Sequence, residues 1–100
     1  MRGGVTYEIT SDVPAELAER YETYMRGHIP ALLATGCFTA ASLSRAAPGQ
    51  YRIRYEAPDQ AALDRYLAEH APALRAAFAA HFPSGVSVRR AVWEVVQAWP

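Results

Sequence analysis

The chain has 100 residues, with ten basic side chains, ten acidic side chains and no net charge at pH 7. This length predicts one domain, residues 1–100, with a free energy of unfolding on the order of 5–15 kcal/mol. The balanced charge argues against nucleic acid or an anionic membrane as a partner, and the lack of any lysine excludes Schiff-base and P-loop lysine chemistry.

The N-terminal part predicts a strand followed by a helix. Residues 5–10 alternate apolar and polar side chains, which is the period of a strand with one buried face. Ser11 and Asp12 are cap candidates, and Pro14 and Glu16 follow them as in the first turn of a helix. One helix face is then marked by residues at helical spacing: Leu17, Tyr21, Tyr24 and His28.

Two residues predict that this helix ends near His28. Gly27 tolerates a left-handed cap, and Pro30 disfavours helical angles in the residue before it. Thr35-Gly36 then turns the chain into an extended run. The pattern Tyr-x-x-x-His-x-Pro-Ala-Leu recurs from Tyr66, so we predict two copies of one unit, each a helix that ends in a His-x-Pro corner at His28 and His70.

The rest of the chain predicts a hairpin, a broken helix and a last strand. Turn residues 46–49 separate residues 37–45 from the alternating run 51–56. Pro58-Asp59 starts a helix that Pro72 interrupts and that resumes to about His81. The last strand is residues 86–96. The order βαββαβ predicts an α+β, ferredoxin-like domain, in which a four-stranded antiparallel sheet carries its helices on one face.

Alternation also assigns side chains to the two faces of this sheet. In the third strand Tyr51, Ile53 and Tyr55 face the helices, which leaves Arg52, Arg54 and Glu56 on the open face. In the last strand Arg90 shares a face with Glu94, and Arg89 shares the other with Trp93. An uncovered sheet face, an apolar fraction of 51% and the residues Trp93 and Trp99 predict a homodimer in which two sheets face each other.

Most of the chain resembles an uncharacterised bacterial family of proteins of roughly a hundred residues. The residues that carry the resemblance are His28-Ile29-Pro30, Thr35-Gly36, Phe38, 51–55, Tyr66-Leu67, His70-Ala71-Pro72, Leu74-Arg75, Phe82-Pro83 and Arg90. The chain departs from that family at Cys37 and in its Trp99-Pro100 ending. The resemblance implies a ferredoxin-like fold of the dimeric α/β-barrel type, and it implies no reaction.

The sequence contains no strong catalytic or metal-binding motif. The histidines, the carboxylates and Cys37 lack ligand spacing, so we expect neither a metal nor a cofactor. Cys37 is interpreted as a buried strand residue. His28 and His70 are interpreted first as turn residues that bond a local carbonyl, and second as ligand or proton-transfer groups. With no leader, no internal disulfide and no apolar run of bilayer length, we expect a soluble cytoplasmic protein.

Three functions fit these observations. We favour a homodimeric barrel that binds a small anionic or aromatic molecule without catalysis. The alternatives are a cofactor-independent monooxygenase or isomerase in which His28 handles a proton, and a small-molecule-sensing regulatory module. The expected ligand site lies between the open sheet face and the His28 corner, and its candidate residues are His28, Arg54, Tyr55 and Arg90.

Overall fold

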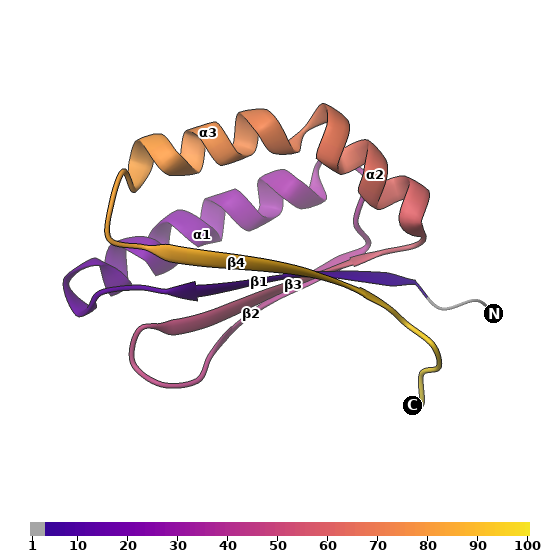
Figure 1. Cartoon of the computed structure of the whole chain (residues 1–100), viewed down its shortest axis with the longest axis horizontal. Helices are drawn as coiled ribbons and strands as arrows, with labels where there is room; N and C mark the ends of the chain where they lie inside the picture. The colour runs from indigo at the N-terminus through magenta and orange to yellow at the C-terminus, as the bar shows by residue number, and fades with distance from the viewer. Residues whose placement is uncertain (1–3) are drawn as a thin grey trace.

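The computed structural model describes residues 4–100 as one antiparallel sheet covered on one face by helices (Figure 1). The strands lie in the order β2-β3-β1-β4. In chain order the elements are β1 (Val5–Asp12), the 3-10 helix η1 (Ala15–Leu17), α1 (Ala18–Leu33), β2 (Ala40–Arg45), β3 (Gln50–Ala57), α2 (Gln60–Glu69), α3 (Ala71–His81) and β4 (Ser87–Glu94). The predicted α+β, ferredoxin-like fold is therefore confirmed.

The central strands β1 and β3 carry the core on their helix-facing side. Register places Tyr7 beside Tyr55 and Ile9 beside Ile53, and all but Ile9 are buried. Helix α1 covers them with Tyr21, Met25 and Leu32, and α2 covers them with Leu63 and Tyr66. Burial of each such side chain stabilises the fold by about 1.5–3 kcal/mol. The predicted facing of Tyr51, Ile53 and Tyr55 toward the helices is confirmed.

The open face of the sheet carries Arg52, Arg54 and Glu56, as alternation along β3 predicted. Arg52 and Arg54 of β3 lie 3.7 and 3.6 Å from the same carboxylate, that of Glu8 on β1. Arg89 of β4 pairs with Asp12 at 3.1 Å, and Glu56 accepts a hydrogen bond from Thr6 at 3.0 Å. Trp93 is the large apolar side chain on this face, and its indole N–H donates to Glu8 at 3.3 Å.

The prediction that the first helix ends near His28 is wrong. Helix α1 continues through Gly27 and Pro30 to Leu33, and Gly27 has no positive φ. Pro30 removes one N–H from the last turns, but the turn beyond it buries Leu32 almost completely, which offsets the lost hydrogen bond. The helix ends instead where Gly36 adopts a φ of +79° and donates to the carbonyl of Leu33 at 3.1 Å.

The repeated His-x-Pro pattern does not build two equal corners. His28 lies inside α1, whereas His70 lies at the junction of α2 and α3 and makes no side-chain cap bond. Pro72 falls in the first turn of α3, where a backbone N–H has no helical partner to lose. The helix therefore continues through the first copy of the motif, whereas it breaks at the second copy, between α2 and α3.

Of the two predicted helix starts, the cap at Ser11 and Asp12 is wrong and the start at Pro58-Asp59 is confirmed. Ser11 and Asp12 are the last residues of β1 and cap nothing, and the chain enters η1 through Pro14 without a side-chain cap bond. Pro58-Asp59, by contrast, directly precedes α2 as predicted, and Asp59 caps this helix, because its carboxylate accepts from the N–H of Ala62 at 2.8 Å.

Candidate functional site

An apolar pocket of about 40 Å³ lies between the sheet and helices α1 and α3. Its walls come from β1, β3 and β4 below, and from α1, α2 and α3 above. The residues that carry its chemistry are Tyr55, Tyr66, His28, Arg75 and Arg90, and its apolar walls include Met25, Leu32, Ile53, Leu74 and Phe78. Helical spacing brings His28, Leu32 and Met25 to one face of α1, which is the face that meets the sheet.

Tyr55 lines this pocket, and its hydroxyl group has no hydrogen-bond partner among the described residues. Its side chain is completely buried, and within residues 4–100 nothing accepts from or donates to its Oη. Burial raises the pKa of the Tyr55 phenol far above its ordinary value, with smaller contributions from the neighbouring phenols Tyr66, Tyr21 and Tyr7. Tyr55 therefore stays a neutral hydrogen-bond donor, and an unpaired buried donor of this kind costs about 1–3 kcal/mol.

Two arginines reach the same pocket from different elements. Arg75 of α3 donates to the hydroxyl of Tyr7 at 2.9 Å, and Arg90 of β4 lies beside Ile9 in the sheet register. Burial raises the pKa of Tyr66 to about 12, and the charges of Arg75 and Arg90, which line the same pocket as Tyr66, oppose this shift. Neither arginine pairs with a carboxylate among the described residues 4–100.

His28 supplies the one imidazole of the pocket. Its ring stacks on Tyr24 with centroids 5.3 Å apart and lies 6.3 Å from the ring of Phe78. Burial lowers the pKa of His28 below its ordinary 6.5, so the ring is neutral at pH 7 and can accept a proton. The imidazole therefore lies in an aromatic cluster on the helix and is not part of a turn.

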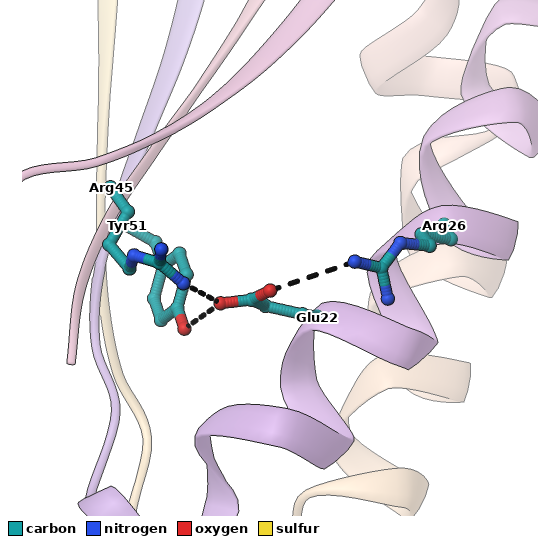
Figure 2. Close-up of polar contacts among 4 residues, drawn as sticks. All are labelled: Glu22, Arg26, Arg45 and Tyr51. Carbon is teal, nitrogen blue, oxygen red and sulfur yellow. Dashed lines mark hydrogen bonds and ion pairs between the residues drawn. The ribbon is translucent and has the colours of Figure 1, made fainter. Parts of the chain in front are cut away.

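Polar contacts at the other end of α1 fix the wall of the pocket. Glu22 accepts from the hydroxyl of Tyr51 at 2.5 Å and from Arg45 at 2.7 Å, while Arg26 lies 3.7 Å away (Figure 2). Tyr51 in turn packs against Tyr21, with ring centroids 4.8 Å apart. Because Tyr21 lines the pocket, this contact network holds one of its aromatic walls in place.

The structure brings together three of the four predicted site residues. His28, Tyr55 and Arg90 line one pocket, on the helix-facing side of the sheet. Arg54 does not: it lies on the opposite face beside Glu8, because side chains of adjacent residues in a strand point to opposite faces. The expected site between the open face and His28 is thus corrected to a site between the sheet and the helices.

Sequence reasoning missed Arg75 and Tyr66 as pocket residues. Arg75 falls three residues beyond Pro72, on the helix that resumes, and only the path of α3 over the sheet brings it to Tyr7. Tyr66 enters the sequence analysis only as the start of the repeated Tyr-x-x-x-His pattern and as part of the family resemblance, with no chemical role. Tyr66 and Arg75 lie on either side of a helix break, so their spacing in the sequence does not predict that they line the same pocket.

Residues 4–100 contain no group of three or more His, Cys, Asp or Glu side chains positioned to hold a metal ion. Over the same residues, none of the helices has the length and apolar character needed to cross a bilayer.

Comparison with known proteins identifies a family and a fold. Residues 4–96 match the profile of a family described as a domain of unknown function, DUF4286. No curated protein matches the sequence. Among solved structures, the fold is similar to that of a "putative monooxygenase" from Shewanella loihica PV-4, with a TM-score of 0.67, 16% identity, and coverage of 98% of this chain and 99% of that one.

Two other solved structures are similar to the same degree. One is a "putative antibiotic biosynthesis monooxygenase" from Caulobacter crescentus CB15, with a TM-score of 0.70, 16% identity, and coverage of 96% and 92% of the two chains. The other is a protein of unknown function from Nitrosomonas europaea, with a TM-score of 0.69, 13% identity, and coverage of 99% and 97%. At these identities the likeness concerns the fold.

Proposed function

Because the chain belongs to the DUF4286 family, a domain of unknown function, we propose a function from its pocket: the protein binds a small aromatic or apolar molecule that carries an anionic group. The observation that carries the proposal is the buried, unpartnered hydroxyl of Tyr55, a residue that lines the pocket. A ligand oxygen in reach of this hydroxyl would remove the cost of an unmade hydrogen bond.

The charges at the pocket support the anionic group. Arg75 and Arg90 line the pocket yet are exposed, so they lie at its mouth, and neither has a carboxylate partner within residues 4–100. Arginine binds carboxylates through paired, charge-assisted hydrogen bonds. The apolar body of the ligand would then lie against Met25, Leu32 and Phe78, and its anionic group at the two arginines.

The size of the pocket requires that one wall moves when a ring enters. A cavity of about 40 Å³ holds roughly three waters, whereas a dry cavity that takes benzene has about 150 Å³. Helix α3 is the wall best able to move, because Ala71 is the one residue of α3 that is fully buried. The break at His70 precedes this helix, and a turn at Gly85, which has a φ of +92°, lies four residues beyond its end at His81.

A ligand screen with two matched variants tests this proposal. We expect benzoate, salicylate or a similar aromatic carboxylate to raise the melting temperature of the wild-type protein. Arg90→Met should lose most of this shift, whereas Arg54→Met, the same change on the opposite sheet face, should keep it. Equal shifts in both variants would contradict the assignment of Arg90, and no shift by any aromatic carboxylate would rule out the binding function.

A cofactor-independent monooxygenase is the second candidate, and His28 favours it. The neutral imidazole in the pocket can take the proton of a phenol, and two proteins of similar fold are described as putative monooxygenases. In a balanced reaction, 1-naphthol and O₂ give 1,4-naphthoquinone and water: one oxygen atom enters the ring as the ring hydrogen leaves, and the other departs as water. O₂ itself is the oxidant.

Oxygen consumption distinguishes this candidate from simple binding. A monooxygenase would consume one O₂ for each quinone formed from 1-naphthol, and His28→Gln would abolish the consumption while Arg54→Met retained it. Binding of 1-naphthol without oxygen uptake by the wild-type protein would reject the enzyme and leave the binding function in place.

We also propose that two copies pair through the open face of the sheet. This face carries three arginines and three carboxylates, which are Arg52, Arg54, Arg89, Glu8, Asp12 and Glu56. Two copies of the face related by a two-fold axis can therefore pack together with opposite charges in contact. Sedimentation equilibrium at micromolar concentration should give about twice the chain mass of 11.0 kDa. A monomer under these conditions would reject the pairing.

A further inference from the structure

The exposed apolar surface of this protein is concentrated in one short stretch. Among residues 4–100, four large apolar side chains are exposed, and all of them lie between residues 92 and 99: Val92, Trp93, Val96 and Trp99. Val96 is 92% exposed and Trp99 is 75% exposed. Val92 pairs with Tyr7 and so lies on the helix-facing side of β4, whereas Trp93 lies on the open face. Trp93, Val96 and Trp99 are therefore the exposed apolar side chains that indicate an interaction site.

The path of residues 95–100, here called the C-terminal arm, begins at the open face of the sheet. The N–H of Val95 donates to the carbonyl of Gly4 at 2.9 Å, which extends the pairing of β4 with the start of β1 by one bond. Beyond that bond the arm leaves the sheet on the side away from the helices (Figure 1). Trp93, just before the arm, already lies on the open face beside Glu8.

We infer that the C-terminal arm of one copy packs against a second copy of the chain, with Val96 and Trp99 as its apolar contacts. This inference rests on the proposed pairing of open faces and adds a part to it. The arm leaves the sheet on the side where the second copy would lie, so its apolar side chains are carried to the partner without any change in β4.

The area of the open face explains why an arm is needed. Four strands about 4.8 Å apart, each about eight residues long at about 3.3 Å per residue, give roughly 500 Å² of flat surface. A stable interface buries about 800 Å² on each partner. A tryptophan brings about 150–250 Å², so Trp99 together with Val96 closes most of the difference.

The chemistry of the adjoining surface favours a second copy over an unrelated protein. The open face has equal numbers of arginines and carboxylates and is neutral as a whole. Such a face is complementary to a second copy of itself across a two-fold axis, and it is not complementary to a strongly charged partner. The match to the family profile ends at residue 96, so Trp99 lies outside the part of the chain that the family shares.

Tryptophan fluorescence tests the inference on the full chain. The protein has two tryptophans, so Trp93→Phe leaves Trp99 as the single emitter. Its emission should shift to shorter wavelength as the protein is concentrated from nanomolar to tens of micromolar, in step with dimer formation. A dimer in which Trp99 keeps the emission of an exposed indole would overturn the arm contact alone, and a chain that stays monomeric would overturn the pairing as well.

Sedimentation velocity on arm variants supplies a second measurement. Trp99→Ser should raise the dissociation constant of the dimer at least tenfold, whereas Ala98→Ser, a change in the same arm with little apolar area, should leave it within about twofold. Circular dichroism should be unchanged in both, because the arm is exposed in a single copy. Equal dissociation constants for wild type and Trp99→Ser would contradict the inference.

Discussion

Glu22 of α1 accepts a 2.5 Å hydrogen bond from the hydroxyl of Tyr51 on β3, and this contact joins the first helix to the sheet. The bond from Tyr51 is the main reason why the pKa of Glu22 lies below its ordinary 4.5, and Arg45 and Arg26 lower it further. Arg45 ends β2, so the same carboxylate also holds the β2–β3 hairpin against the helix.

This contact predicts a loss of stability in acid. A carboxyl group with a lowered folded pKa contributes stability that is full above its ordinary pKa of 4.5 and is lost as the pH falls through the folded value. Urea unfolding at a series of pH values should therefore show a decline below about pH 4.5 that Glu22→Gln reduces. Glu19→Gln, one turn earlier on the same helix, is the matched control; an equal effect of both changes would contradict the role of Glu22.

The unpartnered hydroxyl of Tyr55 predicts a stabilising mutation. Tyr55→Phe removes a buried donor that is left unpaired, so the free energy of unfolding should rise by about 1 kcal/mol, or about 4–8 °C in melting temperature for a domain of this size. The same change should weaken binding of the aromatic carboxylate.

Tyr21→Phe is the control for Tyr55→Phe. The Tyr21 hydroxyl donates to Ser11 at 2.9 Å in the same core, so its removal should lower the free energy of unfolding by about 0.5–1.5 kcal/mol. Thermal and urea unfolding measure both variants, and a loss of stability in Tyr55→Phe equal to that in Tyr21→Phe would show that the Tyr55 hydroxyl is satisfied.

His28 predicts a second pH dependence in a different range. Because burial lowers its folded pKa below 6.5, the unfolded chain binds more protons, and stability should fall as the pH decreases through 6.5 toward the folded value. His28→Gln should flatten the stability profile in this range, whereas His81→Gln, at the exposed end of α3, should not. A profile that is flat in the wild-type protein between pH 7 and 5 would contradict the buried position of His28.

The course of α1 through Gly27 can be checked with single substitutions. A side chain added at Gly27 meets no atom within 4 Å, so Gly27→Ala should stabilise the helix by about 0.5–1 kcal/mol. Gly49→Ala should do the opposite, because Gly49 has a φ of +82° and its added carbon would collide with the carbonyl of Val13. Urea unfolding measures both, and destabilisation by Gly27→Ala would indicate that the helix ends there after all.

Local sequence patterns predicted the structure correctly wherever a single physical cause acts within a few residues. Alternation along β3 correctly placed Tyr51, Ile53 and Tyr55 under the helices, because a strand has only two faces and one of them is buried. Pro58-Asp59 correctly marked the start of a helix, because the group that Asp59 bonds, the N–H of Ala62, lies in the first turn of that helix.

Local patterns failed where burial elsewhere competes with a local preference. Pro30 predicts a helix end, yet α1 continues past it and buries Leu32, two residues later. Arg54 was predicted to share a site with His28, although its position in β3 turns it to the opposite face.

The sequence by itself therefore determined the order of elements, the faces of the strands and the identity of three pocket residues, His28, Tyr55 and Arg90. Only the tertiary structure decided that these three meet under α3, that Arg75 joins them through Tyr7, and that the Tyr55 hydroxyl lacks a partner. The physical reason is range: periodicity and capping act between neighbours in the chain, whereas a pocket is formed by side chains far apart in sequence whose positions depend on how the whole core packs.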